Sequence, residues 1–415
     1  MFENFDRRKA IIIVGIALAL IVLGWLTYLA LRPAVPPPTP VNNANAGLPG
    51  LPSAGGRNLN FPGEINLPIT PEGNVNVNVG ELPAMPPGVV PEVSAPAITQ
   101  GPVAQPDAIG GQVRYYDPAD CKFYEQSGSS RQALSSATYC SVQNITWSPQ
   151  GSSAILEFPD SANIVYDFNT QKQYTLPKEM TEFSFSPDST KIAGKFMADD
   201  PADRWVVSIN PDGSGLAGIE PMGENADKVN VEWSPNQQVV ALARTGEPAG
   251  LFQQQVLLIG FHGENFKSLT VDGRGFEPKW TPDGSRLLYS VYSDQSNYRP
   301  TLWLVDATPD RAGANKQSLS LQTWADKCTM TAEAAFCAVP VELPEGAGFT
   351  RELARGIPDT IWRVDLKTGA TALVTEPRDE AGNGITAASL TVSSDGKSLY
   401  FTDAASGKLR SVKVE

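Results

Sequence analysis

The chain has 415 residues, with 45 acidic and 32 basic side chains, a net charge of −13 and a single histidine, His262. An acidic chain repels phosphate backbones, which argues against nucleic-acid binding, and one histidine excludes histidine-rich metal sites and makes a Ser–His–Asp hydrolase a poor candidate. The 35 prolines are unevenly spread, since 17 of them fall within residues 33–110, so the chain divides into segments of different composition.

Residues 10–31 form an uncharged apolar run, AIIIVGIALALIVLGWLTYLAL. As a helix this run is about 33 Å long, which is enough to cross a hydrocarbon core of roughly 30 Å. Three basic residues, Arg7, Arg8 and Lys9, precede the run, and only Arg32 follows it directly. The positive-inside rule therefore predicts a single-pass signal-anchor in the cell membrane, with residues 1–32 as cytoplasmic N-terminus and transmembrane helix and the C-terminal part extracytoplasmic.

A cleaved secretory signal is the main alternative for this segment. Such signals have a shorter apolar region with a small-residue cleavage site close behind it. The nearest such site here, Ala44-Asn45-Ala46, lies beyond a proline cluster. We therefore favour an uncleaved anchor over a cleaved signal, and both over a buried soluble helix; either of the first two exports the rest of the chain.

Residues 33–110 are rich in Pro, Asn, Gly and Val and contain no lysine. The prolines are too frequent for central strands or helices, and there is too little apolar bulk for a core. This composition predicts a disordered, partly polyproline-II linker that holds a folded domain away from the membrane. The alternation NVNVNV at residues 74–79 is interpreted as part of this linker, with strand addition to a partner's sheet as the alternative.

A five-residue pattern recurs from residue 111 onward: an apolar or aromatic residue, Ser or Thr, usually Pro, an acidic or amide residue, and a small or polar residue. This is the chemistry of a tight turn, because proline presets φ, Asp or Asn bonds its own backbone and glycine accepts positive φ. Short β-branched and aromatic runs follow each turn, which indicates an all-β domain. The six copies begin at Trp147, Phe185, Trp233, Trp280, Met330 and Val392, and the last two are degraded.

The copies are spaced as the blades of a β-propeller are. One four-stranded unit cannot bury both of its faces, whereas units stacked around an axis can. The repeats therefore predict a six-bladed β-propeller over residues 111–415, with an early hairpin within residues 122–134 completing the last blade. If that hairpin belongs to a further blade instead, the count is seven.

The motifs WSPQG, FSPDS, WSPN and WTPDG resemble the PD40 (WD40-like) repeat of TolB-like propellers and of prolyl-oligopeptidase-type propellers. The resemblance covers roughly residues 112–415 and implies a propeller that binds partners or ligands at its faces. It supplies no catalytic residue, because the chain lacks the Gly-x-Ser-x-Gly elbow of the hydrolases. It also departs from TolB, whose small α/β domain is replaced here by a tether.

Four cysteines, Cys121, Cys140, Cys328 and Cys337, lie in the part predicted to be exported, where an even count favours disulfides. Cys328 and Cys337 flank a turn motif, so we expect them to face each other across one hairpin, which leaves Cys121 to pair with Cys140. Free buried thiols are the alternative. A zinc site is disfavoured, because the spacings are not those of zinc fingers.

Most motif residues are interpreted as structural. The repeated aromatic residues are predicted to pack between blades, and Asp188, Asp283 and Asp395 to cap turns. Asp199, Asp200 and Asp203 are interpreted as a solvated acidic loop, with cation or basic-partner binding as the weaker hypothesis.

One long loop, Pro340 to Asp359, interrupts the fifth unit. Phe349, Arg351 and Arg355 give it an amphipathic, locally basic character on an acidic domain. Loops inserted on one face of a propeller often carry its binding function. We therefore name these residues as candidate partner contacts, with the loop at residues 246–254 as a weaker rival.

The leading hypothesis is a membrane-tethered extracytoplasmic propeller that binds a protein or another envelope component. It is expected to be non-catalytic, with no cofactor and no metal. One alternative is a glycan hydrolase, which requires two carboxyl groups in the central funnel with raised pKa values. The other is a small-ligand or glycan sensor with an open, aromatic-lined central pocket.

Overall fold

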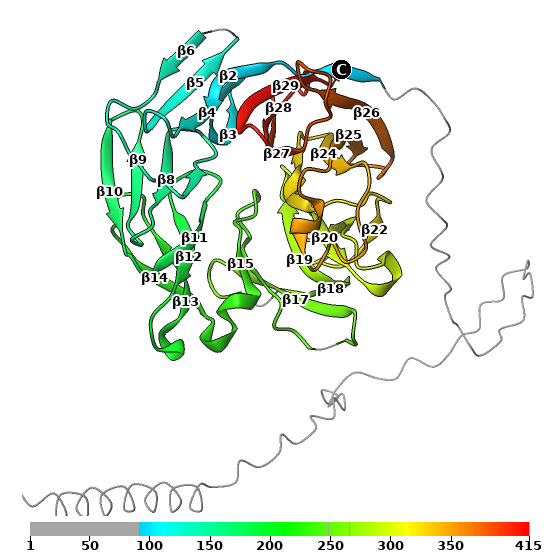
Figure 1. Ribbon diagram of the computed structural model, residues 1–415. Helices are drawn as coiled ribbons and strands as arrows, with labels where there is room; N and C mark the ends of the chain where they lie inside the picture. Colours follow the sequence, from blue (N-terminus) through cyan, green and yellow to red (C-terminus); the bar gives the residue numbers. More distant parts are fainter. Residues whose placement is uncertain (1–90, 129, 248, 265, 415) are drawn as a thin grey trace, which may run out of the picture. The chain divides into compact units, whose positions relative to one another are not determined.

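The computed structural model describes residues 91–128, 130–247, 249–264 and 266–414, which form strands and five short 3-10 helices. Seven sheets stand around a common axis (Figure 1), so the fold is an all-β propeller, as predicted. The expected transmembrane helix at 10–31 and most of the expected linker lie outside the described residues. Within the described part of the chain, no helix has the length and apolar character needed to span a bilayer.

Each blade is a sheet whose strands follow one another from the axis outward. The first blade comprises β3 (Ala104–Ile109), β4 (Gln112–Asp117), β5 (Lys122–Ser127) and β6 (Ser130–Ala133). The second blade comprises β7 (Asn144–Trp147), β8 (Ser153–Glu157), β9 (Asn163–Asp167) and β10 (Lys172–Leu176). The third blade comprises β11 (Met180–Phe185), β12 (Ile192–Phe196), β13 (Trp205–Ile209) and β14 (Ala217–Pro221). The fourth comprises β15 (Val229–Val231), β16 (Val239–Ala243), β17 (Gln253–Gly260) and β18 (Leu269–Asp272); the fifth β19 (Arg274–Trp280), β20 (Arg286–Tyr292), β21 (Thr301–Asp306) and β22 (Gln317–Ser318); the sixth β23 (Cys328–Met330), β24 (Ala334–Pro340), β25 (Asp359–Asp365) and β26 (Thr371–Arg378); the seventh β27 (Ala387–Val392), β28 (Ser398–Asp403) and β29 (Lys408–Lys413).

The blade count is seven, so the alternative holds and the leading count of six was wrong. The hairpin at 122–134 does not complete the last blade; it supplies β5 and β6 of a blade of its own. That blade lacks the repeat motif, because its first turn is Gly110-Gly111, where both residues adopt positive φ (60° and 82°). A two-residue glycine turn joins the first two strands here in place of the five-residue motif, so counting motifs cannot detect this blade.

The ring closes through residues that were assigned to the linker. β1 (Glu92–Ser94) pairs in parallel with β26 as a fifth strand of the sixth blade, and β2 (Ala97–Pro102) pairs with β29 as the outer strand of the seventh. The expected boundary at residue 110 is therefore corrected, since the propeller includes residues from Pro91 onward. Prolines are tolerated here because outer strands need hydrogen-bond partners along one edge only.

A buried arginine joins this closing segment to the blades. The Arg410 guanidinium on β29 donates to the Ala95 carbonyl oxygen (2.7 Å) and to Glu380 Oε2 (3.0 Å), and its Nε lies 3.2 Å from Asp403 Oδ2. A hydrogen bond from the Ala97 N–H, together with Arg410, lowers the pKa of Glu380 to about 2. The N-terminal strands are thus held by charge as well as by the sheet ladder.

The motif turns behave as predicted. In the third, fifth and seventh blades the Ser or Thr hydroxyl donates to the Asp carboxylate two residues on, at 2.5–2.6 Å, in the pairs Ser186–Asp188, Thr281–Asp283 and Ser393–Asp395. The motif aromatics pack between blades, and the Trp147 and Trp280 indole N–H groups donate to the carbonyl oxygens of Gln105 and Glu232 in the preceding blades. These residues build the scaffold.

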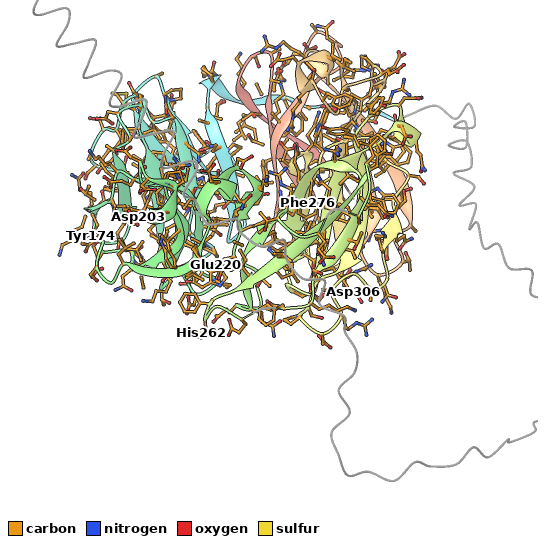
Figure 2. The ribbon with its side chains drawn as sticks, turned by 90° about the horizontal axis from the view of Figure 1, so that it is seen from below. Tyr174, Asp203, Glu220, His262, Phe276 and Asp306 are labelled. Atoms are coloured by element: carbon orange, nitrogen blue, oxygen red, sulfur yellow. A yellow bond between two sulfur atoms is a disulfide. The ribbon has the colours of Figure 1, made fainter. Side chains whose placement is uncertain are left out.

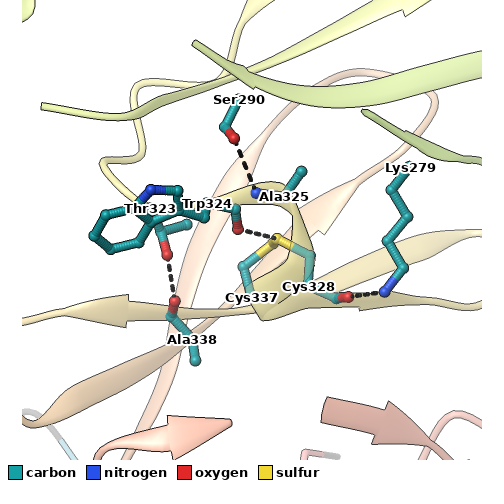
Figure 3. Close-up of a disulfide and its surroundings, with 8 residues drawn as sticks. All are labelled: Lys279, Ser290, Thr323, Trp324, Ala325, Cys328, Cys337 and Ala338. Atoms are coloured by element: carbon teal, nitrogen blue, oxygen red, sulfur yellow. Dashed lines mark hydrogen bonds between the residues drawn. A yellow bond between two sulfur atoms is a disulfide. The ribbon is translucent and has the colours of Figure 1, made fainter. Parts of the chain in front are cut away.

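Both predicted disulfides are present. Cys121 pairs with Cys140, which ties the β4–β5 connection to the link between the first two blades. Cys328 and Cys337 face each other across β23 and β24 (Figure 3), and both are fully buried. This disulfide links the first two strands of the sixth blade, whose copy of the turn motif is degraded. The covalent bond therefore lies beside the turn that lacks the proline and the aspartate of the motif.

Candidate functional site

The propeller has two chemically different faces. Neighbouring strands within a blade are antiparallel, so the connections after the first and third strands lie on one face and all others on the opposite face. The repeat motifs occupy the first of these, which we call the turn face; Figure 2 shows His262, in the β17–β18 connection of this face, at the lower edge of the ring. The opposite face, the loop face, carries the long connections.

The longest described connection on the loop face is the sixth-blade insertion, residues 341–358, between β24 and β25. It contains the predicted contact residues. Phe349 is 58% exposed, and Arg355 pairs with Glu352 in open solvent. Arg351 instead pairs with Asp326 (2.7 Å) and lies over the Trp324 ring, so it fastens the insertion to the scaffold. Contact of these residues with a partner remains a prediction.

The root of the insertion is held by a buried ion pair. The Lys327 ammonium donates to both carboxylate oxygens of Asp359 (2.6 and 2.7 Å), and the Ala387 N–H donates to the same carboxylate (2.7 Å). Burial raises the pKa of Asp359, while Lys327 opposes that shift. The clamp joins the sixth and seventh blades, so the insertion begins and ends on rigid supports.

The insertion also packs on the β20–β21 connection of the fifth blade. Gly346 N–H and Gly348 N–H donate to the carbonyl oxygens of Asn297 (3.1 Å) and Tyr298 (2.7 Å). A Cβ at Gly348 would meet Tyr292 and the Tyr298 backbone at 2.6 Å, so only glycine permits this approach. Asn297 and Tyr298 both adopt positive φ (50° and 54°), which is rare for an aromatic residue and marks a strained turn.

These loops bring four aromatic rings together on the loop face. Phe349 lies 4.7 Å from both Tyr292 and Tyr298, and Tyr298 lies 6.2 Å from Phe252 in the fourth blade, between ring centroids. We call Phe252, Tyr292, Tyr298 and Phe349 the aromatic cluster. Leu251 (69% exposed) and Leu353 (46% exposed) are further apolar side chains of the same two loops that carry Phe252 and Phe349. The cluster therefore spans three consecutive blades.

Sequence reasoning found only part of this cluster. It chose Phe349 and ranked the loop at 246–254, which contains Phe252, as the weaker rival; the two loops contribute to the same surface. Tyr292 and Tyr298 were missed because Tyr292 ends an ordinary strand of the fifth blade, β20, and Tyr298 lies in the connection after it. The position of the loops within their blades could have identified the cluster. The connections β16–β17, β20–β21 and β24–β25 all join the second and third strands of their blades, so they lie on the same face.

Charged side chains on innermost strands form a second candidate site. The Lys279 ammonium on β19 donates to the Cys328 carbonyl oxygen at 2.5 Å (Figure 3), and the Trp280 N–H donates to Glu232 Oε1 at 3.3 Å. Burial raises the pKa of Glu232 to about 7 and lowers that of Lys279. Burial and the neighbouring Asp326 raise the pKa of Glu277 to about 7, with Arg351 acting in the opposite direction.

A hollow of about 550 Å³ on the turn face is the third candidate. It is lined by charged side chains that include Asp283, Arg286, Asp306 and Arg311. Both arginines pair with Asp306, since Arg311 and Arg286 lie 2.8 and 3.4 Å from its carboxylate, while Asp283 accepts from Thr281 and Ser285 in its own turn. The hollow is thus held by internal ion pairs.

The acidic loop lies on the loop face of the third blade, in the connection between β12 and β13. Asp200 caps the short helix η1 (Pro201–Asp203) by accepting from the Ala202 N–H at 2.9 Å, and Asp199, Asp200 and Asp203 are all exposed. Among the described residues no group of three or more His, Cys, Asp or Glu side chains is arranged to hold a metal ion.

Comparison with known proteins supports the fold. The described chain is similar to an oligogalacturonate lyase in complex with manganese (13% identity, TM-score 0.55, covering 77% of this chain and 92% of that one). It is also similar to an oligogalacturonate lyase from Vibrio parahaemolyticus (11%, 0.52, 77% and 93%) and to the Cps50 (Swd1) β-propeller domain from Myceliophteria thermophila (10%, 0.52, 77% and 99%). At these identities the likeness concerns the fold alone.

No protein-family model and no curated protein matches the sequence. The resemblance of the repeats to PD40 and TolB-like propellers therefore stays a prediction, while the propeller itself is established by the seven sheets.

Proposed function

We propose that this chain is a membrane-anchored, extracytoplasmic binding module whose loop face holds another protein of the cell envelope. The aromatic cluster carries this proposal. Apolar side chains gathered on one exposed face, and aromatic anchors above all, are typical of protein-binding surfaces. A strained turn at Asn297 and Tyr298 and a close backbone contact at Gly348 hold these rings together. Strain of this kind is typical of functional sites, which favours a role of this surface in recognition.

The chemistry of the surface indicates the chemistry of the partner. The rings offer apolar contact and two tyrosine hydroxyls, and the insertion that carries Phe349 also carries an exposed pair of opposite charges, Arg355 and Glu352. Such a surface suits an apolar or aromatic polypeptide element better than a strongly charged polymer. The predicted anchor and linker would keep the module within reach of neighbouring envelope proteins.

A capture experiment on the full chain tests this proposal. Phe349→Ser and Tyr298→Ser should each reduce recovery of the specific partner from solubilised membranes at least tenfold, because both remove an anchor ring. Trp205→Ser is the matched control, since Trp205 is an exposed aromatic residue (36%) on the third blade. Equal recovery with all three variants contradicts the proposal.

The glycan hydrolase is the competing function, because Glu232 and Glu277 carry pKa values raised to about 7, as general acids require. It predicts release of reducing ends from envelope glycans that is lost in Glu232→Gln and Glu277→Gln and is unaffected by Phe349→Ser. The binding module predicts that Phe349→Ser reduces partner recovery and that Glu232→Gln and Glu277→Gln leave it unchanged. The same set of variants therefore separates the two functions.

A further inference from the structure

We propose that the hollow on the turn face, between the fifth and sixth blades, binds a small hydroxylated anion that carries a carboxylate or phosphate group. The hollow lies on the face opposite the aromatic cluster and shares no residue with it. The inference therefore goes beyond the proposed function, and each of the two proposals stands or falls by itself. It rests on the shape of the hollow, the balance of its charges and the polar groups of its wall.

The hollow forms where the row of motif turns is interrupted. Between the fourth and fifth blades, the motif side chain of Asn236 donates to the Gly284 carbonyl oxygen of the next turn (2.7 Å). In the fifth blade Asp283 takes the position of Asn236 and accepts from two hydroxyl groups of its own turn (both 2.6 Å), while Ala332 takes the proline position of the sixth turn. The two blades thus leave a hollow of about 550 Å³, which is within the range of roughly 300–1,000 Å³ for small-molecule sites.

Positive charge is in excess in this hollow. Arg311 and Arg286 share one carboxylate, since they lie 2.8 and 3.4 Å from Asp306 (labelled in Figure 2), and the exposed Lys367 comes from the sixth blade. With Asp283 included, the wall carries three basic and two acidic side chains, a net charge of +1, whereas the whole chain carries −13. A concave basic site attracts anions, and the guanidinium fork matches the oxygens of carboxylate and phosphate groups.

Arg286 is placed to bind such a group. Its Nη1 group donates to the Leu366 carbonyl oxygen, so the side chain bridges the two blades at the hollow. Its Nε, like the Thr308 hydroxyl of the same wall, is buried and has no hydrogen-bond partner among the described residues. Buried polar groups without partners are costly. After a small rotation of the Arg286 side chain, an oxyanion in the hollow supplies the acceptor that the guanidinium lacks.

The rest of the wall indicates the body of the ligand. The described wall contains no aromatic ring, so a flat apolar molecule fits it poorly. Hydroxyl and amide side chains both donate and accept hydrogen bonds, which suits a ligand with several hydroxyl groups. These side chains belong to Thr281, Ser285, Thr308, Asn315 and Gln317.

Isothermal titration calorimetry on the purified full chain in detergent tests the inference. The probes are D-glucose 6-phosphate, D-glucuronate, neutral D-glucose and inorganic phosphate. At least one of the two charged sugars should bind with a Kd below about 1 mM, and glucose should not bind. The charged sugar that binds more tightly identifies the anionic group.

Two exposed basic side chains of the wall provide the variant. Arg311→Gln and Lys367→Gln combined should weaken binding of the charged sugar at least tenfold, because both remove a charged donor from the hollow. The matched control is Lys172→Gln and Lys397→Gln combined, which removes two positive charges from exposed positions outside the hollow. This control should change the Kd less than twofold.

Three results overturn the inference. Equal weakening in the hollow variant and its control assigns the effect to overall charge. Inorganic phosphate that binds as tightly as glucose 6-phosphate shows that no hydroxylated body is recognised. Absence of binding by both charged sugars at about 10 mM removes the site. The proposed function is tested separately, since the hollow variant leaves the aromatic cluster intact and should not change partner recovery.

Discussion

Arg410 joins segments that lie far apart in the sequence, because it contacts Ala95, Asp403 and Glu380 at once. Replacing it by Gln leaves the buried Asp403 carboxylate without its ion partner, and losses of this kind cost about 3–5 kcal/mol. We expect Arg410→Gln to lower the free energy of unfolding by roughly 3 kcal/mol in denaturant titrations. Arg355→Gln, at an exposed ion pair, should change it by less than about 0.5 kcal/mol; equal effects would refute the closing role of Arg410.

Glu277 makes stability depend on pH in a predictable direction. Its pKa is raised from 4.5 to about 7 in the folded chain, chiefly by burial, so the folded state holds the extra proton between these values. The free energy of unfolding therefore falls as the pH rises through this window. Glu277→Gln should be more stable than the original chain by at least about 1 kcal/mol at pH 8, and the difference should shrink toward pH 5.

The control for this prediction is Glu342→Gln, at an exposed position of the insertion. Its effect in urea unfolding should be small at both pH values. A Glu277→Gln advantage that grows toward pH 5 would contradict the burial of the charge.

At the scale of elements, the two disulfides differ in access. Cys140 is exposed and Cys121 half-buried, whereas Cys328 and Cys337 are fully buried between β23 and β24. Thiol–disulfide exchange requires access of the attacking thiolate to sulfur. Mild reductant without denaturant should therefore expose Cys121 and Cys140 to alkylation well before Cys328 and Cys337, as read by peptide mass; simultaneous labelling, or the reverse order, would refute this ordering of the two bridges.

The elements that could be predicted are those whose local chemistry repeats. The motif turns and both cysteine pairs follow from residues close together in the chain, so their spacing carries the information. β1 and β2 could not be found this way. Their pairings join residues 92–102 to residues from 376 onward, and their prolines are acceptable only at the outer edges that closure creates.

The aromatic cluster shows the same limit. Phe252, Tyr298 and Phe349 lie on separate blades, nearly a hundred residues apart at the extremes, and the propeller alone brings them together. A sequence can flag each loop as long or unusual. Only the alternation of connections between the two faces reveals that these loops share one face.

At the scale of the whole molecule, the proposal needs the propeller outside the cytoplasm. Alkaline phosphatase fused after residue 415 should be active, and the fusion should stay in the membrane fraction after carbonate washing, because an uncleaved helix at residues 10–31 anchors it. An active fusion that is released in soluble form would indicate a cleaved signal instead. An inactive fusion would overturn the predicted orientation.

The most direct test of the account is photo-crosslinking in native membranes with p-benzoylphenylalanine at single positions of the full chain. Tyr298 and Phe349 probe the loop face, while His262 on the turn face and Trp205 on the third blade serve as controls. The account predicts adducts with one other envelope protein from the first two positions and not from the controls. Adducts from His262 or Trp205, with none from Tyr298 and Phe349, would contradict it.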